Sequence, residues 1–166
     1  MQTERDLATL IPFAASVTFG LLAWGAVIMN YVWPRMRTLA LEAAVRPLLH
    51  LHLFRFMGLA FIIPGVAGLH LTPEFAMPAA YGDLISMGLA WLALFATGSR
   101  YARPALWVFN VWGFGDLLFA FYQGTIGVGI EPAALGATWF IPTVFVPLLM
   151  LSHVLMIVKL VRAPQA

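Results

Sequence analysis

The chain has 166 residues, of which 62% are hydrophobic and 10% are charged, and its mean hydropathy is +0.91. This composition excludes an ordinary soluble domain and predicts an integral membrane protein. The formal net charge is +2, but the Lys and Arg residues are scattered over short loops, so we expect no nucleic-acid partner. The chain has no cysteine, which excludes disulfide bonds and thiolate metal sites.

The predicted elements are membrane-spanning helices, each of which needs about 20 mainly apolar residues. Five segments meet this length: Leu10–Trp33, Leu48–Leu71, Pro78–Thr97, Ala105–Val128 and Ala137–Val161. No linker or low-complexity stretch divides the chain, so residues 1–166 are predicted to form a single integral membrane domain. The expected fold class is all-α, a transmembrane helical bundle of about five spans.

The charges in the loops predict the orientation of this bundle. Basic residues occupy alternate loops, namely Arg35, Arg37 and Arg46, then Arg100 and Arg103, then Lys159 and Arg162. The other two loops carry Glu74 and Glu131. The positive-inside rule therefore predicts that the N-terminus lies outside and the C-terminus in the cytoplasm. Between the first two spans, loop 34–47 is bounded by prolines and is expected to contain a short interfacial helix.

Four ionisable residues fall inside the predicted spans, where an unpaired charge costs several kcal/mol. At about 1.5 Å per residue, Arg55 is predicted about 10 Å from the inner edge, His153 about 12 Å, Asp116 about 16 Å and Asp83 about 22 Å. The first three share a level and Asp83 lies a step further out. We therefore expect Asp116 to face Arg55.

The charge balance of these four ionisable residues predicts that they bind a proton or a polar ligand. Two carboxylates share one guanidinium, so full ionisation would leave a net negative charge unless His153 were protonated. We therefore expect one proton to be shared within the group, which suits proton coupling or recognition of a polar ligand. On the fourth span Gln123 follows Asp116 at helical spacing and joins the predicted site. The alternative is a static polar lock that fixes the helices.

Two short patterns add weaker hypotheses. The same tripeptide occurs on two neighbouring antiparallel spans, as Gly82-Asp83-Leu84 and Gly115-Asp116-Leu117. The repeat indicates either an inverted pair of half-sites or a chance coincidence. His50 and His52 point about 200° apart on a helix and cannot bind one metal ion.

His52 also shares a helix face with Arg55, and His153 is predicted at a similar depth across the bundle. These two histidines are the alternative ligands of a b-type haem, with Arg55 near a propionate. The leading expectation includes no cofactor and no metal.

Motifs of known enzymes are absent from the sequence: there is no Walker loop, no H-E-x-x-H and no G-x-S-x-G. An intramembrane enzyme that uses Asp83 or Asp116 as acid or base remains an alternative. The leading expectation is a protein without catalytic activity.

Three stretches between Phe54 and Gly127 carry a family resemblance: "FRFMGLAF", "FAMPAAYGDLISMGLA" and "WVFNVWGFGDLLFAF". They resemble a group of small bacterial polytopic membrane proteins that carry an Arg in one span, followed by "FALPA-x-x-GD" and "W-x-x-x-G-x-x-DL" patterns. The resemblance implies Arg55, Asp83 and Asp116 as shared features and implies no activity. The fifth span, with His153, lies outside the match.

The expected function is therefore that of a multi-pass protein of the bacterial cytoplasmic membrane whose Arg55–Asp83–Asp116 network, with Gln123 and His153, binds a proton or a small polar ligand and supports transport. The expected partners are the lipid bilayer and either a second copy of the chain or a membrane complex, because five spans are few for a self-contained transporter. The alternatives are an accessory or assembly subunit and a haem-binding redox protein.

Overall fold

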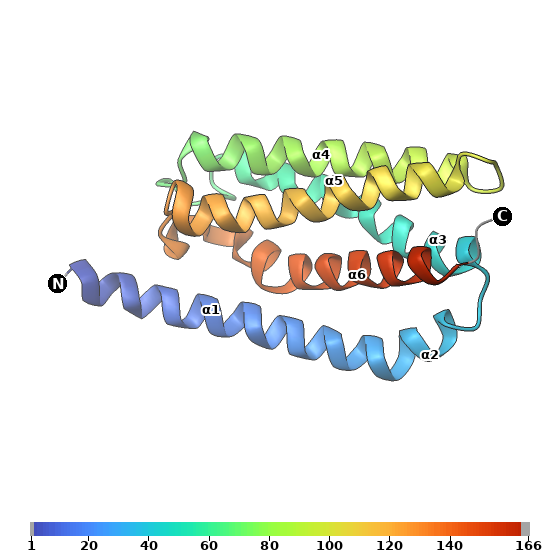
Figure 1. Ribbon diagram of the computed structural model, residues 1–166. Coiled ribbons are helices and arrows are strands. Elements are labelled where there is room, and N and C mark those ends of the chain that lie inside the picture. The colour runs from blue at the N-terminus through green and yellow to red at the C-terminus, as the bar shows by residue number, and fades with distance from the viewer. Residues whose placement is uncertain (1, 164–166) are drawn as a thin grey trace.

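The computed structural model describes residues 2–163, and the side chains of residues 8–163 (Figure 1). Five helical stretches are long and apolar enough to cross a membrane: Ala8–Met36, Leu41–Ile62, Pro73–Ala96, Ala102–Gly127 and Ile141–Arg162. No β-strand occurs among the described residues. The prediction of an all-α bundle with about five spans is therefore confirmed.

The elements follow one another along the chain as α-helices joined by short 3₁₀ and π-helical turns. They are α1 (Gln2–Val27), η1 (Ile28–Val32), α2 (Trp33–Met36), α3 (Leu41–His52), η2 (Leu53–Ile62), α4 (Pro73–Ala96), α5 (Ala102–Tyr122), η3 (Gln123–Gly127), η4 (Pro132–Trp139), η5 (Ile141–Phe145) and α6 (Val146–Arg162). Helices α4 and α5 pack side by side along the bundle, and η2 packs against α4 (Figure 1).

The second span differs from its predicted boundaries of Leu48 and Leu71. It begins at Leu41 and ends at Ile62, so residues 41–47 of the loop expected to contain an interfacial helix are instead the first turns of α3. The physical reason lies at both ends of the span. Ala40 is extended, so α3 begins directly after it, and Gly65 has a φ of 85° that no helix accommodates.

The second half of this span is a 3₁₀ helix, η2, which is unusually long for its type. With three residues per turn, side chains at positions i and i+3 lie directly above one another. His52, Arg55, Gly58 and Phe61 follow this spacing, and all four are buried. An α-helix would rotate the same four positions progressively around its axis, so the 3₁₀ geometry is what keeps Arg55 and Gly58 on the face that contacts α4.

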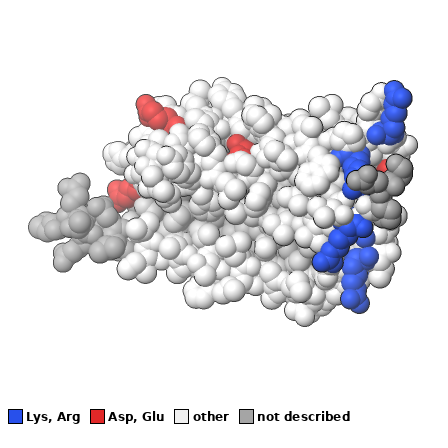
Figure 2. All heavy atoms as spheres, viewed as in Figure 1, with Lys and Arg blue, Asp and Glu red and all other residues white. Residues whose placement is uncertain are grey.

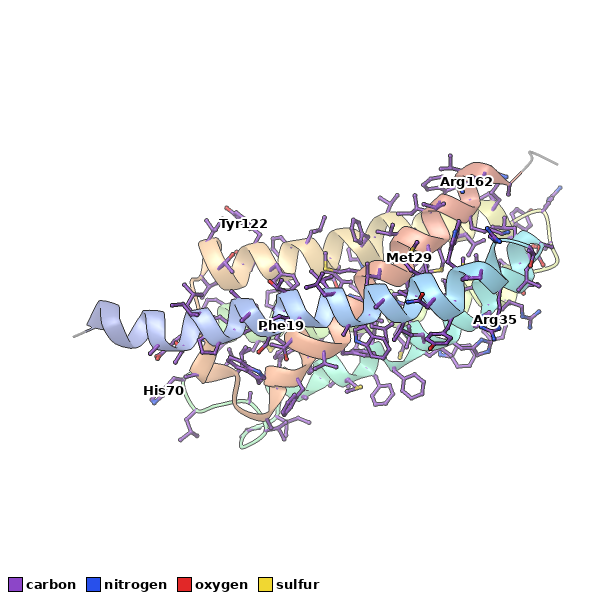
Figure 3. The ribbon with its side chains drawn as sticks, turned by 90° about the horizontal axis from the view of Figure 1, so that it is seen from below. Phe19, Met29, Arg35, His70, Tyr122 and Arg162 are labelled. Atoms are coloured by element: carbon purple, nitrogen blue, oxygen red, sulfur yellow. The ribbon has the colours of Figure 1, made fainter. Side chains whose placement is uncertain are left out.

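Helix α1 lies at the edge of the bundle and packs against α6 and η5 (Figure 1). The indole N–H of Trp24 donates a hydrogen bond of 3.0 Å to the carbonyl of Val144 in η5. In a π-helical turn the regular backbone bonding is interrupted, so a side chain from another helix can satisfy a free carbonyl. Phe19 of α1 and Met29 of η1 are exposed on the outer face of this span (Figure 3).

The Lys and Arg side chains that are drawn gather at one end of the bundle, whereas acidic side chains lie at the other end, at mid-length and, in one place, among the basic ones (Figure 2). Arg35 and Arg162 lie at one end, and His70 and Tyr122 lie at the other (Figure 3). We call these the basic end and the acidic end, because Glu74, in the first turn of α4, and Glu131, directly before η4, lie at the second end.

The basic end is also held together by charged side chains. Lys159 donates hydrogen bonds to the carbonyls of Arg37, at 3.2 Å, and Leu39, at 2.6 Å. Arg103 donates to the carbonyl of Leu160 at 2.8 Å, at the end of α6. These contacts satisfy backbone carbonyls of α6 and of the connection between α2 and α3. The loops of the basic end are therefore closely tied to α5 and α6.

Candidate functional site

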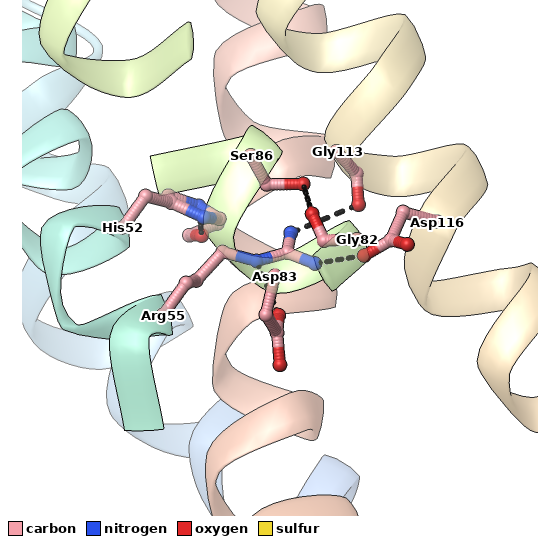
Figure 4. A network of polar contacts seen from close by, with 8 residues as sticks. His52, Arg55, Gly82, Asp83, Ser86, Gly113 and Asp116 are labelled. Carbon is pink, nitrogen blue, oxygen red and sulfur yellow. Dashed lines mark hydrogen bonds and ion pairs between the residues drawn. The ribbon is translucent and has the colours of Figure 1, made fainter. Parts of the chain in front are cut away.

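Arg55 of η2 is the centre of a polar network that joins three spans (Figure 4). Its guanidinium is fully buried and donates from each of its three nitrogens. Nε donates to Oδ1 of Asp83 on α4 at 2.7 Å, and Nη2 donates to Oδ2 of Asp116 on α5 at 2.5 Å. Nη1 donates to the carbonyl of Gly113 at 3.0 Å. The expected pairing of Arg55 with Asp116 is therefore confirmed.

Asp83 also lies at this level, so the prediction that it lies a step further out was wrong. Measured from the helix ends at the basic side, Arg55 and Asp116 lie 14 residues into their spans and Asp83 lies 13 residues from the end of α4. At about 1.5 Å per residue these positions coincide near 20 Å. The error came from the predicted start of the second span, which placed Arg55 too close to the basic end.

Three glycines make room for the two carboxylates and the guanidinium. A Cβ atom at Gly58 would collide with the Asp83 carboxylate, and one at Gly82 would collide with the Asp116 carboxylate. A Cβ atom at Gly113 would lie 2.8 Å from Nε2 of His153 and 3.3 Å from Nη1 of Arg55. At Gly115, in contrast, a Cβ atom would meet nothing within 4 Å. The two Gly-Asp-Leu tripeptides are therefore not equivalent half-sites.

A cavity of about 620 Å³ extends from the acidic end to this network. Gly129, Glu131 and Pro132 line it at the acidic end, and Asp83 and Asp116 line it at the other. The side chains of the two aspartates are 12% and 13% exposed, whereas the Arg55 side chain is fully buried behind them. Both carboxylates line the cavity, whereas the guanidinium does not. The carboxylates, and not the guanidinium, are therefore accessible from the cavity.

Two buried histidines lie on the other side of Arg55. His52 Nε2 and Ser152 Oγ are 2.7 Å apart, and His153 Nδ1 and Asn110 Oδ1 are 2.9 Å apart. The ring of Phe109 packs against both imidazoles, at centroid distances of 4.9 Å. His52 Nδ1 and His153 Nε2 are buried without a hydrogen-bond partner.

Towards the basic end, the histidine layer is followed by a closely packed apolar cluster. Its buried members are Val45, Leu49, Ala90, Ala93, Leu94, Leu106, Phe109, Met156 and Leu160. Most of these side chains are fully inaccessible, so this half of the bundle is closed. The polar site is thus accessible from the acidic end and sealed from the basic end.

The two histidines do not fit a haem between them. Their ring centroids are 4.2 Å apart, so the imidazoles are in direct contact. Axial ligands on opposite faces of a haem need room for the porphyrin plane between them. Among the described residues, no group of three or more His, Cys, Asp or Glu side chains is placed to hold a metal ion.

The remaining predicted site residues lie at different distances from the network. His153 approaches Arg55 through the gap at Gly113. Gln123 begins η3, two turns beyond Asp116, and lines a small hollow together with it. In the described part of the chain no hydrogen bond joins Gln123 to the network. Its predicted place within the site is therefore peripheral in this structure.

Sequence reasoning missed the residues that support the histidines. Asn110 and Ser152 are fully or almost fully buried and contact one imidazole each. Asn110 lies three residues before Gly113, so helical spacing already placed it beside the polar face of the fourth span. Ser152 directly precedes His153, and its contact with His52 depends on the packing of α3 against α6, which the sequence alone does not show.

Comparison with known proteins gives a family but no activity. Residues 12–161 match the family model described as Domain of unknown function (DUF8737). No curated protein and no solved structure matches the chain. The matched range includes every residue of the Arg55 network and both buried histidines. The chain is therefore a member of the DUF8737 family.

Proposed function

We propose that this membrane protein binds a proton or a small polar ligand at the Arg55–Asp83–Asp116 network and supports transport. The observation that carries the proposal is the position of the network. It forms the floor of a cavity that reaches the acidic end, while the basic half beyond it is closed. A site accessible from one side only is what a carrier presents in one of its states.

The charge of the network favours occupancy by a proton or a cation. Two carboxylates face one guanidinium, so the ionised group has a net charge of −1 in surroundings of low polarity. One bound proton or one bound cation neutralises this charge. A permanently empty, ionised site would retain an uncompensated charge, which membrane proteins generally avoid.

We further propose a location and an orientation that agree with the charge distribution. Among the residues whose side chains are described, every Lys and Arg except Arg55 lies at the basic end, in the connections, the helix ends or the first half of α3. By the positive-inside rule, this end faces the cytoplasm if the protein lies in a bacterial inner membrane. In this orientation the cavity opens to the outside. Because five spans are few for a transporter, we expect a homo-oligomer or a membrane-complex partner.

Infrared difference spectroscopy on the protein in lipid nanodiscs tests the binding of a proton. Comparison of acidic and alkaline buffers should show the carbonyl stretch of a buried carboxylic acid in the wild type. Asp116→Asn should remove or shift this band, whereas the matched control Glu131→Gln, at the exposed mouth, should leave it in place. A wild-type spectrum without any band that depends on Asp83 or Asp116 would contradict proton binding.

The second candidate function is that of an accessory subunit in which the network only fixes the helices. The observation that favours it is that Arg55 uses all three guanidinium nitrogens on α4 and α5. In a lock of this kind, Asp116→Asn chiefly lowers stability, by about 3 to 5 kcal/mol, because part of the buried Arg55 charge loses its partner. In a binding site, the variant remains folded and loses binding.

An uncharged triple variant, Arg55→Met with Asp83→Asn and Asp116→Asn, separates the two functions. Buried ion pairs replaced by uncharged residues of similar size often leave stability nearly unchanged. We expect the triple variant to unfold near the wild-type temperature and to lose the infrared band. A triple variant that is as unstable as Asp116→Asn would instead favour the lock.

A further inference from the structure

We propose that the cavity binds an apolar molecule that carries a protonated primary amine, with its ammonium group on Asp83 and Asp116. This inference rests on the proposed function of the same site and assigns its ligand class. A bound proton alone would neutralise the network, but it would leave a cavity of about 620 Å³ without a role. A volume of this order accommodates a small organic ligand.

The walls of the cavity suit an apolar body. They carry the aromatic rings of Phe13, Phe61, Phe75 and Phe121, together with Leu135. These side chains come from α1, η2, α4, α5 and η4. The lining also includes Ile141 and Val146 of the fifth span, so all five spans contribute to the walls. Burial of apolar ligand surface against such walls is favourable by about 25 cal/mol per Å².

The floor of the cavity offers free acceptor atoms. Asp83 and Asp116 each bind Arg55 through one oxygen, Oδ1 and Oδ2 respectively. In the described residues no donor is bonded to the other two oxygens, Asp83 Oδ2 and Asp116 Oδ1, which lie against Gly58 and Gly82. Figure 4 shows that the carboxylates approach the guanidinium from different sides. An ammonium group has three N–H donors and no acceptor, so it fits a floor made only of acceptors.

The charges around the cavity exclude an anionic ligand. Among the residues whose side chains are described, no Lys or Arg lines it, and Glu131 adds a third carboxylate at the acidic end. Arg55 is fully buried, and each of its nitrogens already donates to the protein. A ligand carboxylate or phosphate would therefore meet carboxylates and no free cation. The potential of the cavity attracts a cation instead.

Three probes with the same apolar body test this ligand class. Phenylpropylamine, phenylpropanol and phenylpropionate differ in their charge at neutral pH and little in size. We expect the amine to raise the unfolding temperature of the wild type in phosphatidylcholine nanodiscs and to bind at least about tenfold more tightly than the alcohol by calorimetry. The propionate should not bind measurably. Equal affinity for amine and alcohol, or tighter binding of the propionate, would overturn the proposal.

Two substitutions locate the binding in the cavity without altering the network. Ala120 lines the cavity one turn beyond Asp116, so Ala120→Leu should fill part of it and weaken amine binding about tenfold or more. Ala23, on the exposed face of α1, does not line the cavity, and Ala23→Leu is the matched control. Amine binding that is unchanged in Ala120→Leu would place the amine elsewhere and overturn the proposal.

A free amine and the ammonium head of an aminolipid share this chemistry, and the lipid composition of the nanodisc distinguishes them. If aminolipid is the natural occupant, adding phosphatidylethanolamine should weaken the apparent affinity for phenylpropylamine by competition. If a water-soluble amine is the occupant, the affinity should stay the same. Either result is compatible with an ammonium site and identifies its source.

The infrared and binding experiments together distinguish a wrong ligand class from a wrong proposed function. If the infrared band assigned to Asp116 is present and the amine does not bind, the network binds a proton and only the ligand class is wrong. If the band is absent and no probe binds, both proposals fail and the lock is favoured. The unfolding temperature of each sample ensures that only folded protein is compared.

Discussion

At the scale of single residues, the network depends on the absence of side chains as much as on the charged groups. Gly58, Gly82 and Gly113 each leave a space that a carboxylate, the guanidinium or an imidazole fills. The sequence identified Arg55, Asp83 and Asp116, because charged residues within an apolar span need partners. The specific role of Gly82 could not be predicted, since Gly115 occupies the same place in an identical tripeptide and faces open space.

This contrast gives a matched pair of substitutions. Gly82→Ala forces the Asp116 carboxylate to move and should destabilise the protein by about 1 to 3 kcal/mol, as overpacking generally does. Gly115→Ala has no such contact and should be neutral, or stabilise by up to about 1 kcal/mol through helix propensity. Denaturant-induced unfolding in detergent micelles measures both. Equal effects of the two substitutions would contradict the close approach of Asp116 to Gly82.

A second residue-scale prediction concerns the histidine layer. Ser152→Ala removes the hydroxyl that contacts His52 Nε2 and leaves both nitrogens of a fully buried imidazole without a partner. A buried polar atom that loses its hydrogen bond costs about 1 to 3 kcal/mol. Thermal unfolding should show this loss. In the control Ser99→Ala, the hydroxyl bonds only the Ala96 carbonyl and the Tyr101 N–H in an exposed turn, where water can replace it, so the loss of stability should be smaller. A stable Ser152→Ala variant would mean that the contact with His52 contributes little.

At the scale of elements, the 3₁₀ helix η2 determines which side chains reach the site. Hydropathy predicted the existence of all five spans correctly, but it does not distinguish an α-helix from a 3₁₀ helix. The predicted span began at Leu48 and not at Leu41, which gave the wrong depth for Arg55 relative to Asp83, and it also assumed one continuous α-helix. The three-residue repeat of His52, Arg55, Gly58 and Phe61 is visible in the sequence, and it is the signal from which the tighter helix could have been inferred.

An insertion tests this repeat. One alanine added after Phe56 rotates the rest of η2 by about 120°, so Met57 replaces Gly58 at the position that contacts Asp83. We expect a lower unfolding temperature and loss of the infrared band of the network. An alanine added after Leu69, which is 91% exposed in the connection between η2 and α4, is the control and should have little effect on either quantity. Equal tolerance of both insertions would contradict the tight packing of η2 on α4.

At the scale of the whole molecule, the separation of charge predicts one orientation in the membrane. Because the chain has no cysteine, each introduced cysteine is a unique label. Ala133, near Glu131, and Ser99, near Arg100, are both exposed and lie in connections at opposite ends. In intact cells a membrane-impermeant maleimide should label Ala133→Cys and not Ser99→Cys, and after lysis it should label both. The reverse pattern would invert the proposed orientation.

The cavity that ends at mid-depth has an electrical consequence. In a cavity wide enough for water, the electrical potential at the floor is close to that of the solution at the acidic end. Most of a transmembrane voltage therefore falls across the closed apolar cluster of the basic half. Moving one elementary charge through the full voltage involves about 2.3 kcal/mol per 100 mV. Binding of a cation to Asp83 and Asp116 from the acidic side should therefore depend weakly on voltage, and its passage through the basic half should carry nearly all of the voltage dependence.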